Sequence, residues 1–212
     1  MQDATVFWDK VSEKYAKAPI SDEEAYQFTL NKTRGYLSPE DHIMEVGCGT
    51  GSTALLLAEN VREITASDLS GKMIEIGRRK ALDNGISNVN FIQEDVLDSS
   101  FNAEPYDAVL AHNVLHLLED VPKAIQTITD RLKPDGLFIS KTVCKFGAGT
   151  PLKWRLMKVL LPIMQFFGKA PYVNFMEAGE WEATLKEGGF EIVESGNFPK
   201  GALSRYIVAR KI

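Results

Sequence analysis

The chain has 212 residues, of which 44% are hydrophobic and 25% are charged, as is typical of a globular protein with a single buried core. Its net charge of −5 and pI of about 5.3 argue against a nucleic-acid-binding protein, which normally carries a basic face. No apolar run is long enough to span a membrane, and the first residues lack the pattern of a secretory signal. We therefore expect one cytoplasmic domain over residues 1–212, with Cys48 and Cys144 reduced.

Residues 1–40 are predicted to form an N-terminal cap of two helices. Apolar residues recur at helical spacing over 6–16 and again over 21–37. Ser21 and Glu24 stand three positions apart, which is the spacing of a capping box. The second helix is therefore expected to begin at Ser21.

Short apolar strands then alternate with helices. The predicted strands are 42–46, 62–67, 88–92, 106–112 and 136–143, and the predicted helices are 51–59, 71–84, 114–119, 121–132 and 177–187. This alternation predicts a Rossmann-like α/β fold, an open and mostly parallel sheet of seven strands with helices on both faces. The last two strands, over 190–195 and 205–210, are joined by a loop without a helix. They predict a hairpin, so one edge of the sheet should be antiparallel.

A glycine-rich turn follows the first strand. Gly47, Gly49 and Gly51 stand between that strand and the next helix. Glycine lets the chain turn sharply and lets a ligand approach the backbone. Asp68 follows Gly51 by seventeen residues, about where an open α/β sheet places an acidic side chain against ribose hydroxyls. The sequence therefore predicts a ligand that contains a nucleoside.

The spacing of the turn narrows the choice of ligand. A dinucleotide-binding fingerprint is G-x-G-x-x-G and a P-loop needs Gly-Lys-Ser/Thr, whereas this chain has G-x-G-x-G and continues as Gly51-Ser52. Glu45 stands just before the turn. Its carboxylate would repel a pyrophosphate but could hold the ammonium group of an amino-acid-like cofactor.

Five motifs in order resemble those of class I S-adenosylmethionine-dependent methyltransferases, in particular the small-molecule branch that includes ubiquinone/menaquinone and phospholipid methyltransferases. They are E-V-G-C-G-T-G at 45–51, Asp68 in A-S-D-L-S, and the segments 93–96, 106–110 and 132–137. The resemblance implies S-adenosylmethionine as the cofactor and a last strand that inserts antiparallel into the sheet.

The resemblance also implies which residues contact the cofactor. Asp68 would bind the ribose, and the segment with Asp95 and Val96 would bind the adenine. Tyr15 would close over the cofactor and Met73 would cover the adenine edge; packing of these two side chains within the protein is the alternative. The implied contacts are Tyr15, Glu45, Gly47, Cys48, Gly49, Gly51, Asp68, Leu69, Met73, Asp95, Val96, His112 and Asn113.

Histidine is the natural base near neutral pH for an acceptor that must lose a proton, and the chain has three. His42 opens the first strand, away from the glycine turn, and is expected to be structural. His112 ends the fourth strand and is the first catalytic candidate, with a polar pocket lining as the alternative. His116 is the second candidate and could share a helical face with His112, with packing as the alternative. No third ligand stands at a recognisable spacing, so we expect no metal site.

Residues 147–176 interrupt the alternation, because some thirty residues stand where a short connection would suffice. Pro162 should kink or split this segment. We expect a lid over the acceptor pocket, adaptable to an apolar substrate. A homodimer interface, extra core packing and a weak contact with anionic lipid are the alternatives. The predicted substrate contacts are Trp154, Met164, Tyr172 and Phe175.

The predicted function is methyl transfer from S-adenosylmethionine to a small apolar or amphipathic acceptor by in-line displacement. The charge balance, and His112-Asn113 in place of an Asn-Pro-Pro-Tyr motif, disfavour methylation of nucleic acid. A non-catalytic cofactor-binding regulator or partner subunit stays open, as does an NAD-dependent oxidoreductase, against which the glycine spacing and Glu45 weigh.

Overall fold

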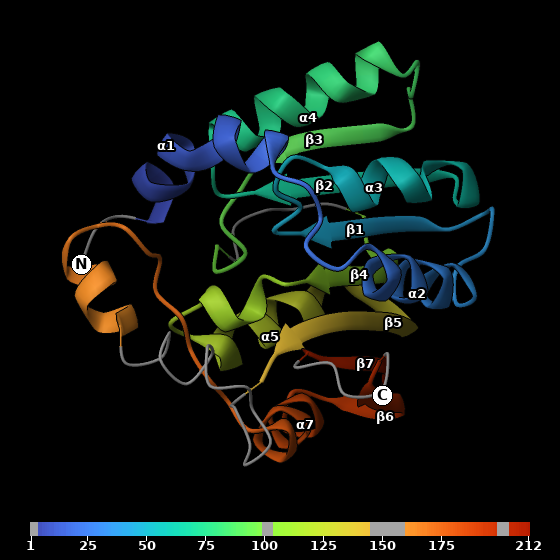
Figure 1. Cartoon of the computed structure of the whole chain (residues 1–212). Coiled ribbons are helices and arrows are strands. Elements are labelled where there is room, and N and C mark those ends of the chain that lie inside the picture. Colours follow the sequence, from blue (N-terminus) through green and yellow to red (C-terminus); the bar gives the residue numbers. More distant parts are fainter. Residues whose placement is uncertain (1–3, 99–103, 145–159, 199–203) are drawn as a thin grey trace.

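The computed structural model of the chain describes residues 4–98, 104–144, 160–198 and 204–212. It contains a seven-stranded sheet in the order β3-β2-β1-β4-β5-β7-β6 (Figure 1). The strands are β1 (His42–Val46), β2 (Glu63–Asp68), β3 (Val89–Gln93), β4 (Tyr106–His112), β5 (Leu132–Val143), β6 (Phe190–Asn197) and β7 (Ser204–Lys211). The helices are α1 (Ala4–Lys17), α2 (Glu23–Arg34), α3 (Ser52–Leu57), α4 (Gly71–Asp83), α5 (Val121–Arg131) and α7 (Ala178–Glu187), with 3-10 turns η1 (Ala58–Asn60) and η2 (Leu115–Leu117).

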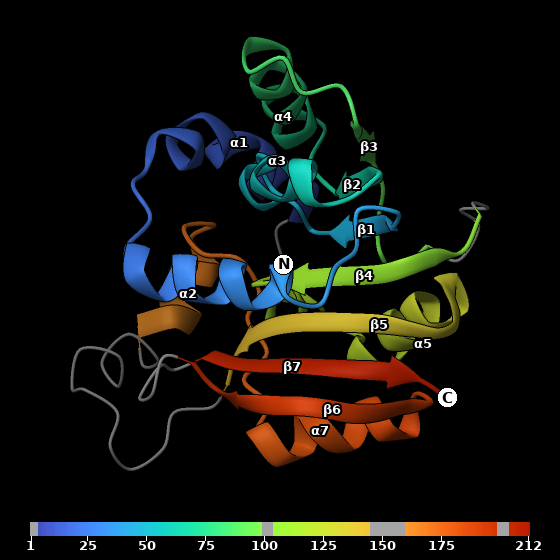
Figure 2. The ribbon, with the colours of Figure 1, turned by 90° about the vertical axis from the view of Figure 1, so that its right-hand side faces the viewer.

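The pairing of the strands confirms the predicted fold class. β1 pairs in parallel with β2 and β4, and the parallel pairing continues to β3 and β5. β7 runs antiparallel between β5 and β6, so the C-terminal hairpin forms one edge of the sheet (Figure 2). The strand order changes direction between β1 and β4, which is the point where open α/β sheets bind their ligands.

Alternate side chains of the strands face two separate cores. Ile43 of β1 packs in one cluster with Leu57 of α3 and Ile74 of α4. Its neighbour Met44 packs in the other cluster, with Ile125 of α5. Because side chains of a strand alternate between faces, one apolar run supplies both cores. Helices therefore cover both faces of the sheet, as predicted.

Helix α1 is held against the start of α4. Oδ1 of Asp9 accepts hydrogen bonds from the Ser70 hydroxyl at 2.5 Å and from the Lys72 backbone N–H at 3.2 Å. The hydrogen bond from Ser70 is the main cause of the lowered pKa of Asp9. A carboxylate at a helix N-terminus also interacts favourably with the helix dipole. The result is that α1 lies beside α4, near the carboxyl ends of the strands (Figure 1).

The predicted capping box of α2 is wrong. The helix begins at Glu23 with Asp22 as its N-cap, and the Asp22 carboxylate accepts a hydrogen bond from the backbone N–H of Ala25 at 2.9 Å. Aspartate and serine are comparable N-cap residues, so the sequence pattern alone did not favour Asp22 over Ser21.

The predicted helix over 114–119 is also wrong, since only the 3-10 turn η2 forms there. Asp120 caps the next helix, α5, and Pro122 lies in its first turn. These two residues fix where α5 begins and leave room for a single turn before it.

Part of the predicted lid, residues 147–159 with Trp154, lies outside the described residues, and so does any helix that Pro162 would split there. Residues 160–166 are helical. No helix in the described ranges is both long and apolar enough to cross a membrane. Cys48 and Cys144 are free, buried thiols.

A buried ion pair fixes the loop that follows β3. Nη2 of Arg131 donates to Oε1 of Glu94 at 2.5 Å and to the backbone carbonyl of Asp98 at 2.9 Å. The side chains of Arg131 and Glu94 are only 7% and 6% exposed. Asp95 and Val96 lie within this loop, so the ion pair determines where they sit.

We expect Arg131→Met to lower the free energy of unfolding by about 3–5 kcal/mol, because it leaves the Glu94 carboxylate buried without its partner. Urea denaturation measures the change. The control is Arg79→Met, whose ion pair with Glu13 has side chains 60% and 62% exposed. This control should change stability by less than about 1 kcal/mol. Equal effects of the two substitutions would show that the buried pair does not stabilise the loop.

Candidate active site

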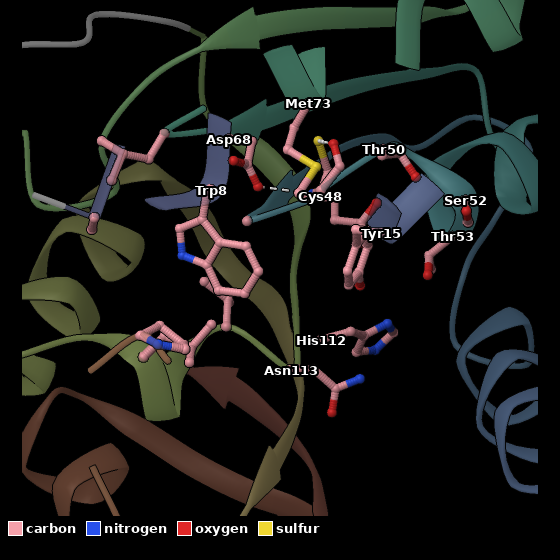
Figure 3. A pocket seen from close by; sticks show the side chains of 18 of the residues that line it. Trp8, Tyr15, Cys48, Thr50, Ser52, Thr53, Asp68, Met73, His112 and Asn113 are labelled. Atoms are coloured by element: carbon pink, nitrogen blue, oxygen red, sulfur yellow. Dashed lines mark hydrogen bonds between the residues drawn. The ribbon is translucent and has the colours of Figure 1, made fainter. Parts of the chain in front are cut away.

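The carboxyl ends of β1, β2, β4 and β5 line a cavity of about 880 Å³. This is a typical volume for a small-molecule site. The strands contribute Glu45, Asp68, His112 and Lys141 to its wall. Figure 3 shows Asp68 in the upper part of the view, His112 in the lower part, and Tyr15 of α1 at a height between the two.

The glycine turn contributes Gly47 and Gly49 to the wall, and two positions of the turn, Gly47 and Gly51, admit no side chain. Gly47 has φ +64°, and a Cβ there would lie 2.3 Å from a methyl carbon of Val114. Gly51 has φ +74°, and its Cβ would lie 2.4 Å from the Phe91 ring. Both the left-handed backbone and the close approach require glycine. Gly51 is the N-cap of α3 and does not line the cavity, whereas every other predicted cofactor contact does.

Asp68 is fixed by backbone amides on either side. Its Oδ2 accepts from the Gly49 N–H at 2.8 Å and its Oδ1 accepts from the Ser70 N–H at 2.9 Å. Burial raises the pKa of Asp68, and the two amides counteract that rise. Each of the two carboxylate oxygens of Asp68 can accept one more hydrogen bond, so the carboxylate can bind two neighbouring hydroxyl groups of a ligand.

Glu45 is a buried carboxyl group with an unused oxygen. Its side chain is 2% exposed, it accepts from the backbone N–H of Ala54, and its Oε2 has no hydrogen-bond partner among the described residues. Burial raises its pKa to about 8, and the nearby charge of Asp68 adds to the rise. A buried carboxylate is stabilised by an adjacent cation. Because Glu45 also lines the cavity, a ligand with a positive group fits there.

The loop after β3 presents Asp95 and Val96 to the cavity. Asp95 Oδ1 accepts from the backbone N–H of Leu97 at 2.9 Å, which leaves its other carboxylate oxygen available. Leu69 and Met73 line the same cavity, and Met73 is only 2% exposed. Met73 therefore belongs both to the wall of the cavity and to the packed interior. A contact with the adenine edge and packing within the protein, the two alternatives for this side chain, do not exclude one another.

Helix α1 contributes Tyr15 and Trp8 to the wall. The Tyr15 ring lies over the glycine turn, since a Cβ at Gly49 would be 3.6 Å from its Cε1. The rings of Trp8 and Tyr15 meet edge to face with centroids 6.3 Å apart. Trp8 belongs to no motif in the sequence, so its place in the wall was not predicted.

The histidines are not brought together as predicted. His112 lines the cavity, and burial, with a smaller effect of the Lys141 charge, lowers its pKa to about 4. Asn113, next to it, has φ +59° and ends the strand. His116 then falls in η2 and does not line the cavity, so the predicted shared helical face is wrong. His42 lies away from the cavity and packs on Tyr106 with ring centroids 4.7 Å apart.

Of the predicted substrate contacts, only Tyr172 lines the cavity, beside Pro171 and Gln165. Met164 and Phe175 are not in its wall, and Trp154 lies outside the described residues. The Gln165 amide donates to the Pro171 carbonyl at 2.8 Å, which orders this part of the segment.

Several polar wall residues escaped the sequence analysis, among them Lys141 on β5 with Tyr26 and Thr29 on α2. Nothing in their local sequence marks them. Lys141 could have been found from the predicted topology, because it is the direct neighbour of His112 in the parallel pairing of β4 with β5. Within the described ranges, no group of three or more His, Cys, Asp or Glu side chains is arranged to hold a metal ion.

The strand order is that of a Rossmann-like open α/β sheet, and the glycine turn and the two carboxylates beside it lie at the switch point where such sheets bind their ligands. Residues 43–136 match the family described as a methyltransferase domain, which confirms the resemblance drawn from the sequence.

Similar proteins agree with this family. The chain is 30% identical over 141 residues to a demethylmenaquinone methyltransferase of Symbiobacterium thermophilum, a match over 62% of this chain and 55% of that protein. Magnesium protoporphyrin IX methyltransferase of Synechocystis PCC 6803, solved with bound SAH, has a TM-score of 0.74 at 19% identity, over 99% of this chain and 100% of that one. The [4+2]-cyclase SpnF has a TM-score of 0.72 at 21% identity, over 92% of this chain and 83% of that one.

At these identities the two solved structures show the fold alone. The match with the first two curated relatives spans 40% and 63% of their length.

Glu45→Gln should make the protein more stable at high pH in the absence of ligand. A carboxyl group with a pKa of about 8 in the folded state, against about 4.5 when unfolded, carries no penalty below pH 4.5 and its full penalty above pH 8. Between pH 6 and pH 9 the wild type should lose ~2–3 kcal/mol relative to the variant. Urea denaturation at the two pH values measures the difference.

The control for this experiment is Glu63→Gln, at the exposed start of β2. It should leave the pH dependence of the wild type unchanged. If Glu45→Gln behaves like this control, the carboxyl group of Glu45 does not titrate in the way its burial implies.

Proposed function

We propose that the protein transfers a methyl group from S-adenosylmethionine to a small acceptor with an apolar or amphipathic body. The observation that carries this proposal is the buried, unpartnered Oε2 of Glu45 beside Asp68. S-adenosylmethionine combines an ammonium group, a sulfonium and ribose hydroxyls, and this pair of carboxylates suits all three. The cavity, of about 880 Å³, has room for the cofactor and a small acceptor.

The proposed roles follow the positions of the side chains. Glu45 holds the ammonium group, Asp68 the ribose hydroxyls, and the segment of Asp95 and Val96 the adenine. Tyr15 covers the bound cofactor from α1. S-adenosylmethionine supplies a methyl group bonded to a positively charged sulfur. A lone pair of the acceptor forms a bond to the methyl carbon from the side opposite the sulfur, and the electron pair of the broken carbon–sulfur bond stays on sulfur.

His112 is proposed as a contact to the acceptor rather than as a strong base. A group whose pKa is lowered to about 4 by burial takes up a proton only weakly at neutral pH. The catalytic contribution of the protein is then mainly to hold the two reactants in line, which is worth up to roughly 7–11 kcal/mol for well-oriented groups. His116 has no part in this proposal, because it does not line the cavity.

The proposed acceptor class rests on the wall of the cavity. Apolar side chains form much of it, including Ile20, Leu30, Leu117, Leu118 and Tyr172. The similar demethylmenaquinone methyltransferase is named for an acceptor of this kind, which supports the proposal. A homodimer, a cytoplasmic location and a lid role for 147–176 stay predictions.

A second candidate is a protein that keeps the site without methyl transfer, such as a cofactor-binding regulator or partner subunit. The likeness of fold to a protein named as a [4+2]-cyclase favours keeping it, because the fold does not by itself require this reaction.

Titration calorimetry separates these functions. S-adenosylmethionine and S-adenosylhomocysteine should bind, and NADH should not; binding of NADH alone would favour the oxidoreductase. Transfer of radiolabelled methyl is then measured on phenols, thiols, quinols and lipid extracts. Cofactor binding without turnover on any of these acceptors would favour the regulator.

Asp68→Asn should weaken S-adenosylhomocysteine binding by about 1–3 kcal/mol, because an amide cannot replace both charged acceptors of the ribose hydroxyls. Calorimetry measures the change, with thermal unfolding to confirm that the variant folds. Asp83→Asn, at an exposed position of α4, is the control and should bind like the wild type. Unchanged affinity in Asp68→Asn would remove this residue from the cofactor site.

A further inference from the structure

One cation in the wall of the cavity is not used by the proposed cofactor contacts. Lys141 lies near the end of β5, half-buried, in direct register with His112 of β4. Both residues line the cavity. The backbone carbonyl of Lys141 accepts a hydrogen bond from the Asn113 N–H at 2.7 Å, so the two strand ends are tied together.

The Lys141 ammonium group is only partly satisfied by the protein. Its Nζ donates to Thr29 Oγ1 of α2 at 3.0 Å. Among the described residues it forms no salt bridge. The negative charge that acts on it is that of Asp22, which already caps α2. An ammonium group has three donors, so at least one remains for a ligand.

Among the described residues, the ammonium group of Lys141 has no carboxylate within salt-bridge distance, and Asp22 acts on it only from farther away. Burial lowers the pKa of Lys141, and Asp22 only counteracts this. A half-buried ammonium gains more from an anionic partner than an exposed one does, because water screens it less. The unpartnered Nε2 of His112 lies in the same wall and supplies a second polar group.

We propose that Lys141 selects an acceptor whose methylated atom is an anionic oxygen, a carboxylate or a phenolate, on an apolar body. This inference rests on the proposed function. The carboxylates of Glu45 and Asp68 suit the cationic cofactor, and Lys141 and His112 receive the acceptor oxygen on neighbouring strands.

The chemistry of such an acceptor agrees with the site. An oxygen that enters as an anion has no proton to lose when it forms its new bond to the methyl carbon, so no strong base is required. The charges balance, because the negative oxygen and the positive sulfonium both become neutral. Lys141 favours the ionised acceptor, which is the reactive form.

The test measures binding to protein saturated with S-adenosylhomocysteine, by calorimetry at pH 8. Two matched pairs of probes distinguish the two kinds of oxygen: octanoate against octanol, and 4-nitrophenol, which is ionised at this pH, against nitrobenzene. We expect at least one acidic probe to bind about tenfold or more tightly than its neutral partner. Lys141→Met should remove that preference while the affinity for S-adenosylhomocysteine stays within about twofold.

Controls make the result specific to this side chain. Lys141→Arg keeps the charge and should keep most of the preference, and Lys123→Met, at an exposed position of α5, should keep all of it. Radiolabel transferred to octanoate is released by alkali as methanol, whereas label on the phenol is stable, so the product identifies which oxygen is methylated.

Three outcomes would overturn the inference. The first is that the wild type shows no preference for either acidic probe, and the second is that Lys141→Met retains the preference. The third is that Lys141→Met weakens S-adenosylhomocysteine binding as strongly as acceptor binding, because Lys141 would then hold the carboxylate of the cofactor. Failure of the wild type to bind S-adenosylhomocysteine would instead contradict the proposed function, so the two failures are distinct.

Discussion

The burial of the Glu45 carboxyl group is the constraint on which the candidate site depends. A carboxylate with one oxygen unpartnered is unfavourable in a protein interior, and the chain tolerates it either by protonating it or by placing a cation against it. The glycine turn makes the second solution available, because a chain with side chains at Gly47 or Gly51 could not fold so close to Val114 and Phe91. Asp68 adds a second carboxylate to the same end of the cavity. Ligand binding and the stability of the turn are therefore linked through one buried charge.

The N-terminal helix completes this site by a separate contact. Asp9 bonds α1 to the start of α4, so the N-terminal helix is anchored to the helix that directly follows Asp68. Tyr15 then lies over Gly49, where an added Cβ would be in ordinary van der Waals contact with the ring, 3.6 Å from its Cε1. Glycine at this position is required by its φ of +55° rather than by the ring above it. The anchor of the cap, the two hydrogen bonds of Asp9, is independent of the strand pairing.

The sequence predicted the sheet and the residues that line the cavity around the glycine turn well, because these features are local. Strand β1, the glycine turn and Asp68 each have a signature within a few residues, and a parallel sheet brings strand ends together wherever the strands lie in the chain. The errors arose where neighbours compete. Asp22 replaced Ser21 as N-cap, and the early start of α5 left only one turn around His116. Lys141 and Trp8 have no local signature, because their roles come from register and from helix docking. The acceptor side was therefore predictable only in outline.

The strand order of the sheet places the acidic and the basic side chains that the strand ends contribute to the cavity on opposite sides of the switch point. The switch between β1 and β4 separates two pairs of strand ends: Glu45 and Asp68 lie on β1 and β2, and His112 and Lys141 on β4 and β5. In the proposed function the cationic cofactor lies against the first pair and the anionic acceptor against the second, on either side of the switch point. Because opposite charges attract most strongly where water is least able to screen them, a partly buried cavity reinforces that arrangement. Transfer of a methyl group from a cation to an anion is helped by bringing these two charges together, and the wall of this cavity places their complementary side chains on adjacent strands.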